Sequence, residues 1–440
     1  MYTKASSGTM LALLLISLLT SAFSSQQTRS EATTTIVPDD YTKIQWVIGN
    51  ATDGDTIFIR AGTYYEHVII NKSISLIGEN KYNTIIEGNG TFSAVVHVTA
   101  DNVNISDFTI QNRNKGDVGI WLEHCRNCTV SGNIIKDIGA SNGVRGVGIA
   151  LDYCEGCTVE RNNINNNNKG VVLAFSYGCI VHRNNVDNNN KFTGIDIHSC
   201  SECIVTRNIL SNNENRGVGM YDSSHCTLGD NNISGSSKNF GVYGSGLPHF
   251  VHDIDVSNTI NGKPIVYLLN EDDLTISSTT HPEIGYLAVV NSTNITVENL
   301  TLKHNGEGVL FAHTNDSIIK KISTFHNGYG IYLVNCDNSA VNENTATNNI
   351  YGIRLWNSSN CMVTENTATN NNVGIILNFC RNSTVSGNKE RTVLFWMEWW
   401  FWSITVPGIV MLAVAFYFFV RAWRRKNSIC SVRGTNKPHP

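Results

Sequence analysis

The chain has little charge, little methionine and no basic stripe along most of its length. Only 15% of its 440 residues are charged, and the formal net charge is −4 at pH 7. A phosphate-binding surface needs clustered Lys and Arg, and no such stripe precedes the last twenty residues, so nucleic acid is not expected as a partner. Four of the six methionines lie near the two ends, at Met1, Met10, Met397 and Met411. Few are therefore left in the body to serve as soft-metal ligands.

Long uncharged apolar runs occur only near the two ends. Lys4, an apolar stretch from Met10 to Leu19 and the small residues that follow predict a secretory signal peptide over residues 1–25. A second run predicts a transmembrane helix over residues 396–420, with tryptophans on its outer side and a basic cytoplasmic tail at 421–440. All twelve Asn-x-Ser/Thr sequons precede this helix. We therefore expect a single-pass cell-membrane protein whose body is extracellular or periplasmic and glycosylated.

Glycine and asparagine are abundant in the body, where they recur in one register. Each repeat has a glycine, an apolar–any–apolar triplet, a turn and another apolar position, and several repeats are 22 residues apart. A unit this short can bury its apolar side only by stacking on its neighbours, so the sequence predicts a solenoid. The nine repeats begin at Gly119, Gly148, Gly170, Gly194, Gly217, Gly308, Gly330, Gly352 and Gly374.

The pattern within each repeat predicts strands. Apolar positions one residue apart indicate a strand with one buried face, and helical repeats would not tolerate so much Gly and Asn. A parallel β-helix fits, because each strand pairs with the same strand one coil on, about 4.8 Å away. Asn stands fourteen residues after the glycine in every repeat except the one with Ile322. We interpret it as a turn residue whose side chains stack and hydrogen-bond along the solenoid and which accepts the left-handed conformation.

The repeats divide the body into four expected parts. Residues 36–118 are predicted to form an N-terminal cap and the first coils, with a helix-like apolar pattern at 41–49. Two blocks of regular repeats follow, at 119–240 and 308–388. Between them, residues 241–307 break the register and are expected to form irregular coils with an excursion loop that either has no chemical role or forms the rim of a binding groove.

Three segments resemble known β-helix proteins. The stretch DGDTIFIRAGTYYEHVIINKSISLIGEN (53–80) resembles the opening coil of pectinesterase-type and NosD-like right-handed β-helix proteins. The repeats CRNCTVSGNIIKDI and NSSNCMVTENTATNN are similar to the NosD-like, periplasmic copper-binding branch, also described as the carbohydrate-binding and sugar-hydrolase repeat. The insert NGKPIVYLLN (261–270) resembles one in archaeal surface members. The resemblance implies an all-β, right-handed single-stranded parallel β-helix over about residues 36–388, with copper as the cofactor that the family name suggests.

Catalysis is left open by the sequence. Glycoside hydrolysis needs two carboxyl groups, and neighbouring coils place Glu123 beside Asp152 and Asp152 near Asp196. These three residues are the catalytic candidates. The sequence has no match to the pectinesterase Gln-Ala-Val and Asp-Phe-Ile-Phe-Gly segments, to the polygalacturonase Gly-His-Gly or to the pectate lyase Arg-x-Pro-x-x-Arg. The sequence therefore does not decide whether the protein is an enzyme, and the missing motifs argue against enzymatic activity.

Eight of the twelve cysteines fall in two columns of the first repeat block. One column shares the parity of an inward apolar position, which favours buried thiols that act as small hydrophobes. A disulfide within a coil and a metal site are the open alternatives. His124 beside Cys125 and Cys128 is the nearest approach to a metal-ligand set.

The outward positions of the first strand carry aromatic residues among charged ones. Such a surface suits sugar recognition, because ring faces stack on pyranose C–H groups while polar groups bind hydroxyls. The sequence therefore predicts a surface module that binds glycans or cell-envelope proteins, with a polysaccharide-active enzyme and a copper-binding accessory protein as alternatives. The ligand-binding candidates are Trp121, His198, Tyr221, Tyr332, Arg354 and Trp356.

Overall fold

The computed structural model describes residues 32–88, 94–113, 117–139, 146–189, 191–389 and 392–395. These residues form two compact units, divided between Val266 and Tyr267, which we call unit 1 and unit 2. The predicted signal peptide, transmembrane helix and basic tail lie outside the described residues. Within the described ranges, no helix is both long enough and apolar enough to cross a membrane.

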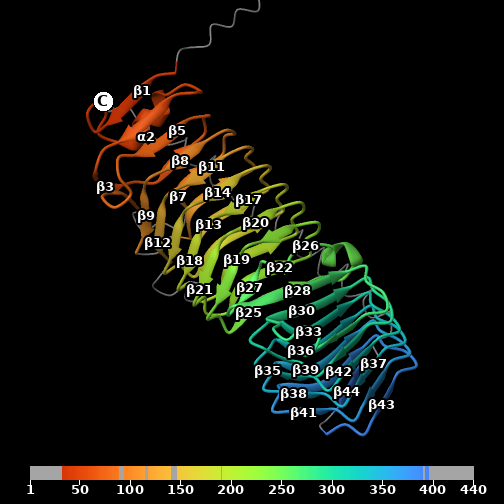
Figure 1. Ribbon diagram of the computed structural model, residues 1–440. Coiled ribbons are helices and arrows are strands. Elements are labelled where there is room, and N and C mark those ends of the chain that lie inside the picture. Colours follow the sequence, from red (N-terminus) through yellow and green to blue (C-terminus); the bar gives the residue numbers. More distant parts are fainter. Residues whose placement is uncertain are drawn as a thin grey trace, which may run out of the picture. The chain divides into compact units, whose positions relative to one another are not determined.

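Unit 1 is a β-helix with three parallel sheets (Figure 1). Sheet 1A contains β1 (Thr34–Val37), β2 (Thr56–Ile59), β5 (Ser75–Gly78), β8 (Asn104–Ser106), β11 (Thr129–Ser131), β14 (Thr158–Glu160), β17 (Ile180–His182), β20 (Ile204–Thr206), β23 (Thr227–Gly229) and β26 (Asp253–Ile254). Sheet 1B contains β3 (Gly62–Tyr65), β6 (Thr84–Glu87), β9 (Thr109–Asn112), β12 (Ile134–Ile138), β15 (Asn163–Asn165), β18 (Asn185–Asp187), β21 (Ile209–Ser211), β24 (Asn232–Ser234) and β27 (Thr259–Ile260). Sheet 1C contains β4 (Val68–Ile70), β7 (Ala94–Val98), β10 (Val118–Glu123), β13 (Val147–Asp152), β16 (Lys169–Ala174), β19 (Thr193–His198), β22 (Arg216–Tyr221) and β25 (Lys238–Tyr243).

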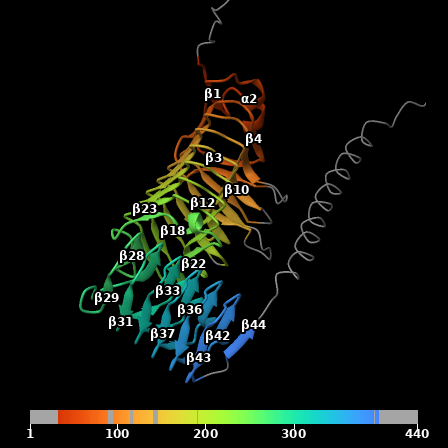
Figure 2. The same cartoon turned by 90° about the vertical axis from the view of Figure 1, so that its right-hand side faces the viewer.

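Unit 2 repeats the plan with fewer coils (Figure 2). Sheet 2A contains β29 (Thr275–Ser277), β31 (Thr296–Glu298), β34 (Ile318–Lys320), β37 (Ala340–Asn342), β40 (Met362–Thr364) and β43 (Thr384–Ser386). Sheet 2B contains β32 (Thr301–Lys303), β35 (Ser323–Phe325), β38 (Thr345–Thr347) and β41 (Thr367–Thr369). Sheet 2C contains β30 (Tyr286–Val290), β33 (Glu307–Ala312), β36 (Tyr329–Val334), β39 (Tyr351–Trp356), β42 (Val373–Asn378) and β44 (Thr392–Phe395).

Equivalent positions of successive coils lie directly beside one another, and we call each such row a file. Ile120 pairs with Ile149, and Ile149 with Val171, in the parallel register of sheet 1C. All three side chains are fully buried. The predicted inward face is therefore confirmed, and the core of each unit runs along its interior as a continuous stack of aliphatic side chains.

The predicted asparagine file is a hydrogen-bonded ladder. In Asn184, the side-chain amide donates to the carbonyl oxygen of Val159 (2.9 Å) and its Oδ1 accepts from the backbone N–H of Asn162 (3.0 Å). The ladder residues do not adopt the left-handed conformation that we expected of them. That conformation belongs to the preceding residue, as at Arg183 (φ 54°). A second buried asparagine file, which includes Asn167, Asn189 and Asn213, was not predicted.

The N-terminal cap contains α2 (Ile44–Asn50), which overlaps the predicted helical pattern at 41–49. Its buried residues are Ile44, Val47 and Ile48, and it packs on β1, β2 and β4. Glu66 caps it, because its two carboxylate oxygens accept the N–H groups of Ile44 and Gln45 at 3.0 and 3.1 Å. Further along, the irregular segment contains η1 (Leu247–Phe250) and β28 (Lys263–Leu269), which pairs antiparallel with β27.

Candidate functional site

The outer face of sheet 1C carries all of the unit 1 residues predicted to bind a ligand or to act in catalysis. Two files lie on it, because alternate residues of each strand point outward. In the first file, Trp121 is followed by Ala150, Val172 and Asp196. In the second, Glu123 is followed by Asp152, Ala174, His198 and Tyr221. The short side chains on β13 and β16 separate two polar clusters.

The first cluster joins β7, β10 and β13, and we call it the Trp121 cluster. The ring of His97 stacks on Trp121 with centroids 4.5 Å apart, and its Nε2 lies 3.0 Å from Oε2 of Glu123. The indole Nε1 of Trp121 donates to Oδ2 of Asp152 at 2.8 Å. The indole therefore leans toward β13, where its register partner Ala150 is buried.

Asp152 differs from an ordinary surface carboxylate. Burial raises its pKa, the hydrogen bond from Trp121 lowers it, and the negative charge of Glu123 raises it again, so that the net shift is upward. Glu123 faces His97, whereas Asp152 faces an uncharged indole. Two carboxyl groups on neighbouring strands thus have different surroundings, and the Trp121 cluster can both accept and donate hydrogen bonds to hydroxyl groups.

The second cluster, around Asp196, is less accessible than the sequence predicts. Asp196 is 3% exposed, although its position faces outward. Its Oδ2 lies 2.9 Å from Lys169 Nζ and 3.1 Å from His198 Nε2, and the ring of His198 stacks on Tyr221. Burial would raise the pKa of Asp196, but the hydrogen bond from His198 and the charge of Lys169 lower it below its ordinary value. The expectation of a solvent-facing carboxylate was wrong, because long neighbouring side chains cover it.

The three candidates in unit 2 form a cation–aromatic cluster. The guanidinium of Arg354 lies over the rings of Tyr332 and Trp356 at 5.5 and 4.9 Å, and over those of Tyr329 and Tyr351 as well. Its Nη1 donates to the hydroxyl of Tyr329 at 2.9 Å. Tyr332 is only 7% exposed, so the predicted open ring face is not available there. The arginine occupies the ring faces that a sugar would need.

The predicted metal ligands do not converge. His124 is exposed and stacks on Tyr153, while Cys125 and Cys128 are buried. The thiols of Cys125 and Cys128 point to the backbone carbonyl oxygens of Val98 and Ala100, each at 3.2 Å. Over the ranges that the structure describes, no group of three His, Cys, Asp or Glu residues is placed to hold a metal ion. The residues therefore do not fit a copper site.

The thiols form a buried file. The eleven cysteines in the described ranges are all buried and free of disulfides, which agrees with the predicted hydrophobic role. The hydrogen bond with the Cys128 thiol raises the pKa of Cys125, and the one with Cys154 lowers it. Burial raises it further, and the net result is a pKa of about 12. Burial raises the pKa of Cys336 to about 12. Cys125 and Cys336 are therefore protonated at neutral pH and are poor nucleophiles.

Sequence reasoning missed an exposed aromatic file at the edge of sheet 1C. Tyr153 and Phe175 are 54% and 55% exposed, and their rings stack at 4.9 Å, as do those of His124 and Tyr153. All three stand five residues after a repeat glycine, which is the signal that could have found them. Because the rings cover one another, only their edges and the two end faces are open.

Comparison with known proteins gives two family matches and one curated relative. Residues 93–254 match the model described as "Right handed beta helix region", and residues 252–391 match "Periplasmic copper-binding protein (NosD)". A "Cell surface glycoprotein" of Methanothermus fervidus is 32% identical over 99 residues, which are 22% of this chain and 16% of that protein.

Solved structures share the solenoid at low identity. The catalytic unit of a GH87 alpha-1,3-glucanase from Streptomyces thermodiastaticus is 14% identical, with 84% of this chain and 70% of that chain covered and a TM-score of 0.43. An alginate lyase from a Paenibacillus species is 12% identical, with 82% and 99% covered and a TM-score of 0.41. The two family matches identify residues 93–254 as a right-handed β-helix and residues 252–391 as NosD-like.

Proposed function

We propose that the protein is a surface-displayed module that binds glycans through the Trp121 cluster on sheet 1C. The observation that carries the proposal is the combination of one indole with two carboxyl groups, Glu123 and Asp152, on neighbouring strands. His97 covers one face of the indole, so a pyranose ring would stack on the opposite face while the carboxyl groups bind sugar hydroxyls. The rigid sheet holds these groups at fixed positions, which lowers the ordering cost of binding.

A surface location supports this proposal. The matched relative is named a cell surface glycoprotein, and one matched family is named periplasmic. The apolar N-terminus and the run at 396–420 fit export and a single membrane anchor, with the β-helix outside. On this proposal, the glycans of the cell envelope are the ligands, and neighbouring envelope proteins reach the module through those glycans.

A glycan array probed with the full chain tests the proposal. Trp121→Ala should lower the affinity for the bound glycans at least tenfold, because the stacking surface and the donor to Asp152 are both lost. Trp46→Ala is the matched control, because Trp46 is an exposed tryptophan on the capping helix α2. Equal affinities for the two variants, or no glycan bound by the unaltered chain, would contradict the proposal.

A polysaccharide hydrolase is the second candidate, and the contrast between the two carboxyl groups favours it. Burial and the charge of Glu123 raise the pKa of Asp152, as a general acid requires, while Glu123 stays beside His97. Asp152→Asn should then abolish release of reducing ends from a bound polysaccharide and leave its affinity unchanged. A pure binding module would release none even before the substitution.

A further inference from the structure

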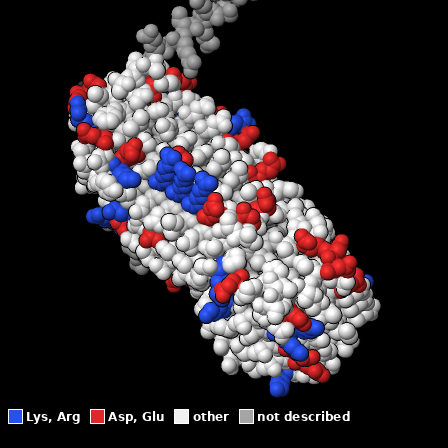
Figure 3. All heavy atoms as spheres, in the orientation of Figure 1, with Lys and Arg blue, Asp and Glu red and all other residues white. Residues whose placement is uncertain are grey.

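Three arginines form a file on unit 1, at the turn between sheets 1A and 1B. Arg161, Arg183 and Arg207 each follow a strand of sheet 1A directly, after β14, β17 and β20. The preceding residues pair in register, and the N–H of Arg161 donates to the carbonyl oxygen of His182 at 3.1 Å. The three arginines therefore stand on adjacent rungs, about 4.8 Å apart. Figure 3 shows basic side chains gathered into a compact patch over this part of sheet 1A.

This file corrects the expectation that the body has no basic stripe. The arginines are 22 and 24 residues apart in the sequence, so no local cluster marks them. Stacking of the coils brings them together. The expectation failed because residues on adjacent rungs of the solenoid are far apart in the sequence.

The turn itself does not require arginine. All three residues are left-handed, with φ of 54°, 54° and 56°, a conformation that Gly and Asn adopt at lower cost. Unit 1 has Gly132 at the same turn position, and unit 2 has Lys321, Glu343 and Glu365 there. Like charges on neighbouring strands are also unfavourable. The arginines thus stand where neither backbone geometry nor mutual electrostatics favours them.

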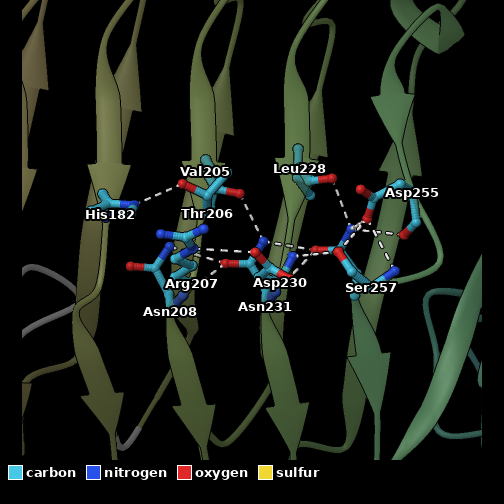
Figure 4. Close-up of polar contacts among 11 residues, drawn as sticks. His182, Val205, Thr206, Arg207, Asn208, Leu228, Asp230, Asn231, Asp255 and Ser257 are labelled. Atoms are coloured by element: carbon cyan, nitrogen blue, oxygen red, sulfur yellow. Dashed lines mark hydrogen bonds and ion pairs between the residues drawn. The ribbon is translucent and has the colours of Figure 1, made fainter.

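Nearby acids neutralise only the two ends of the file. Nη1 of Arg161 lies 3.8 Å from Oε1 of Glu160, and Nε of Arg207 lies 3.2 Å from Oδ2 of Asp230 (Figure 4). The side chains of Arg161 and Arg207 remain 61% and 53% exposed. The central Arg183 is exposed and makes no ion pair with any acid in the described ranges.

Most of the residues beside the file are polar. His182 lies beside it, and its Nδ1 is 2.8 Å from the hydroxyl of Thr206. Burial and the charges of Arg183 and Arg207 lower the pKa of His182, so its ring is neutral at neutral pH. Asn163 and Asn185 stand two residues after Arg161 and Arg183 and are partly exposed, whereas the exposed Ile209 takes this position after Arg207. Amide side chains thus follow Arg161 and Arg183 on the sheet 1B side, and the hydroxyl of Thr206 lies on the sheet 1A side.

We propose that this arginine file binds a linear acidic polysaccharide that runs along unit 1, with its carboxylate or sulfate groups on successive arginines. Guanidinium groups bind such anions through two parallel hydrogen bonds, and the fixed rung spacing suits a polymer with regularly placed charges. The bordering amides can bind hydroxyls between the acidic groups. No aromatic ring stands in the file to stack on bases, which favours a polysaccharide over single-stranded nucleic acid. The site is separate from the Trp121 cluster and does not depend on it.

Binding of the full chain to polygalacturonate, measured at several salt concentrations, tests this inference. Arg183→Gln should weaken binding about tenfold, the equivalent of one hydrogen bond to a charged group, and should flatten the salt dependence. Lys321→Gln, at the same turn position in unit 2, is the matched control and should change neither quantity. The charge reversal Arg183→Glu should weaken binding further, and thermal unfolding shows whether each variant is folded.

Two further probes decide between ligand classes. Neutral dextran should not compete with polygalacturonate, and a short DNA duplex should compete only weakly. Equal binding of Arg183→Gln and the unaltered chain, or tighter binding of DNA than of polygalacturonate, would overturn the inference. Trp121→Ala should still bind polygalacturonate through the arginine file, so failure here is distinguishable from failure of the proposed glycan site on sheet 1C.

Discussion

Units 1 and 2 follow the same backbone plan but fill equivalent files with different side chains. The thiol file of unit 1, which includes Cys179, Cys203 and Cys226, is represented in unit 2 by Ser317, Ser339, Cys361 and Ser383. The inner file of sheet 1B contains Ile164, Val186 and Leu210, whereas that of sheet 2B contains Thr324, Ala346 and Ala368. Three successive coils of unit 1 carry arginine at the left-handed turn, where three successive coils of unit 2 carry Lys321, Glu343 and Glu365.

This difference separates what builds the coil from what the coil displays. Parallel strand pairing and the asparagine ladders recur in both units, so they are the common structural elements. Residue type at the thiol file and at the left-handed turn varies while the backbone stays the same. A file that varies without changing the coil is free to carry a binding function.

The largest expected effect concerns the asparagine ladder, the element that the two units share. Asn184→Ala in unit 1 should lower the free energy of unfolding by about 2–4 kcal/mol, because the N–H of Asn162 and the carbonyl oxygen of Val159 lose a buried partner. Denaturant unfolding measures this change. Ile322 interrupts the ladder in unit 2, and Ile322→Asn should be nearly neutral, since the gained hydrogen bonds offset lost apolar burial. A loss below about 0.5 kcal/mol for Asn184→Ala would show that the ladder is not a common stabilising element.

The second-largest expected effect concerns the buried ion pair of Lys169 and Asp196 in unit 1. Lys169→Met in unit 1 should cost about 1–3 kcal/mol near pH 7, because the buried carboxylate of Asp196 keeps only His198 as a partner. The exposed pair of Lys321 and Glu343 in unit 2, 3.9 Å apart, gives the control, and Lys321→Met should change stability by less than about 0.5 kcal/mol.

Acid should reduce the effect of Lys169→Met. The folded pKa of Asp196 lies below the ordinary value of 3.8, so its ionised contacts stabilise the fold fully above that value. This contribution is lost as the pH falls through the lower folded pKa. Unfolding free energies of the variant and the unaltered chain should therefore converge in strong acid, and a constant difference across the pH range would contradict the assignment.

The sequence predicts the coil far better than it predicts the surface. Inward residues such as Ile149 and Val171 follow from period-two alternation, because the parity of a strand position fixes its side. The burial of Asp196 does not follow, since it depends on how Lys169, His198 and Tyr221 fold over their neighbours. The odd or even position of a residue along a strand determines which face of the sheet it lies on. Side-chain packing then determines whether solvent reaches it.

The thiol file offers a test with a smaller effect. Cys203→Ser in unit 1 should change stability by no more than about 1 kcal/mol, because unit 2 already places serine there and its hydroxyl has a backbone partner. In Ser339, for example, the hydroxyl donates to the carbonyl oxygen of Asp337 at 3.0 Å. Thermal unfolding measures the change. A loss of several kcal/mol would mean that the thiols contribute packing that serine cannot replace.

The smallest effect on stability, and the sharpest use of the comparison, comes from moving the charge pattern of unit 1 onto unit 2. The double substitution Glu343→Arg and Glu365→Arg puts three cations on adjacent rungs with Lys321, in turns whose φ of 54° to 57° matches the arginine turns of unit 1. These side chains are exposed, so stability should change by less than about 1 kcal/mol. If adjacent cations on this turn suffice to bind an acidic polysaccharide, the variant should show a second polygalacturonate site that survives Arg183→Gln and disappears at high salt. If it binds no more than the unaltered chain, then the amides and hydroxyls beside Arg183 are needed as well, and the difference between the units lies in the whole surface and not in the cations alone.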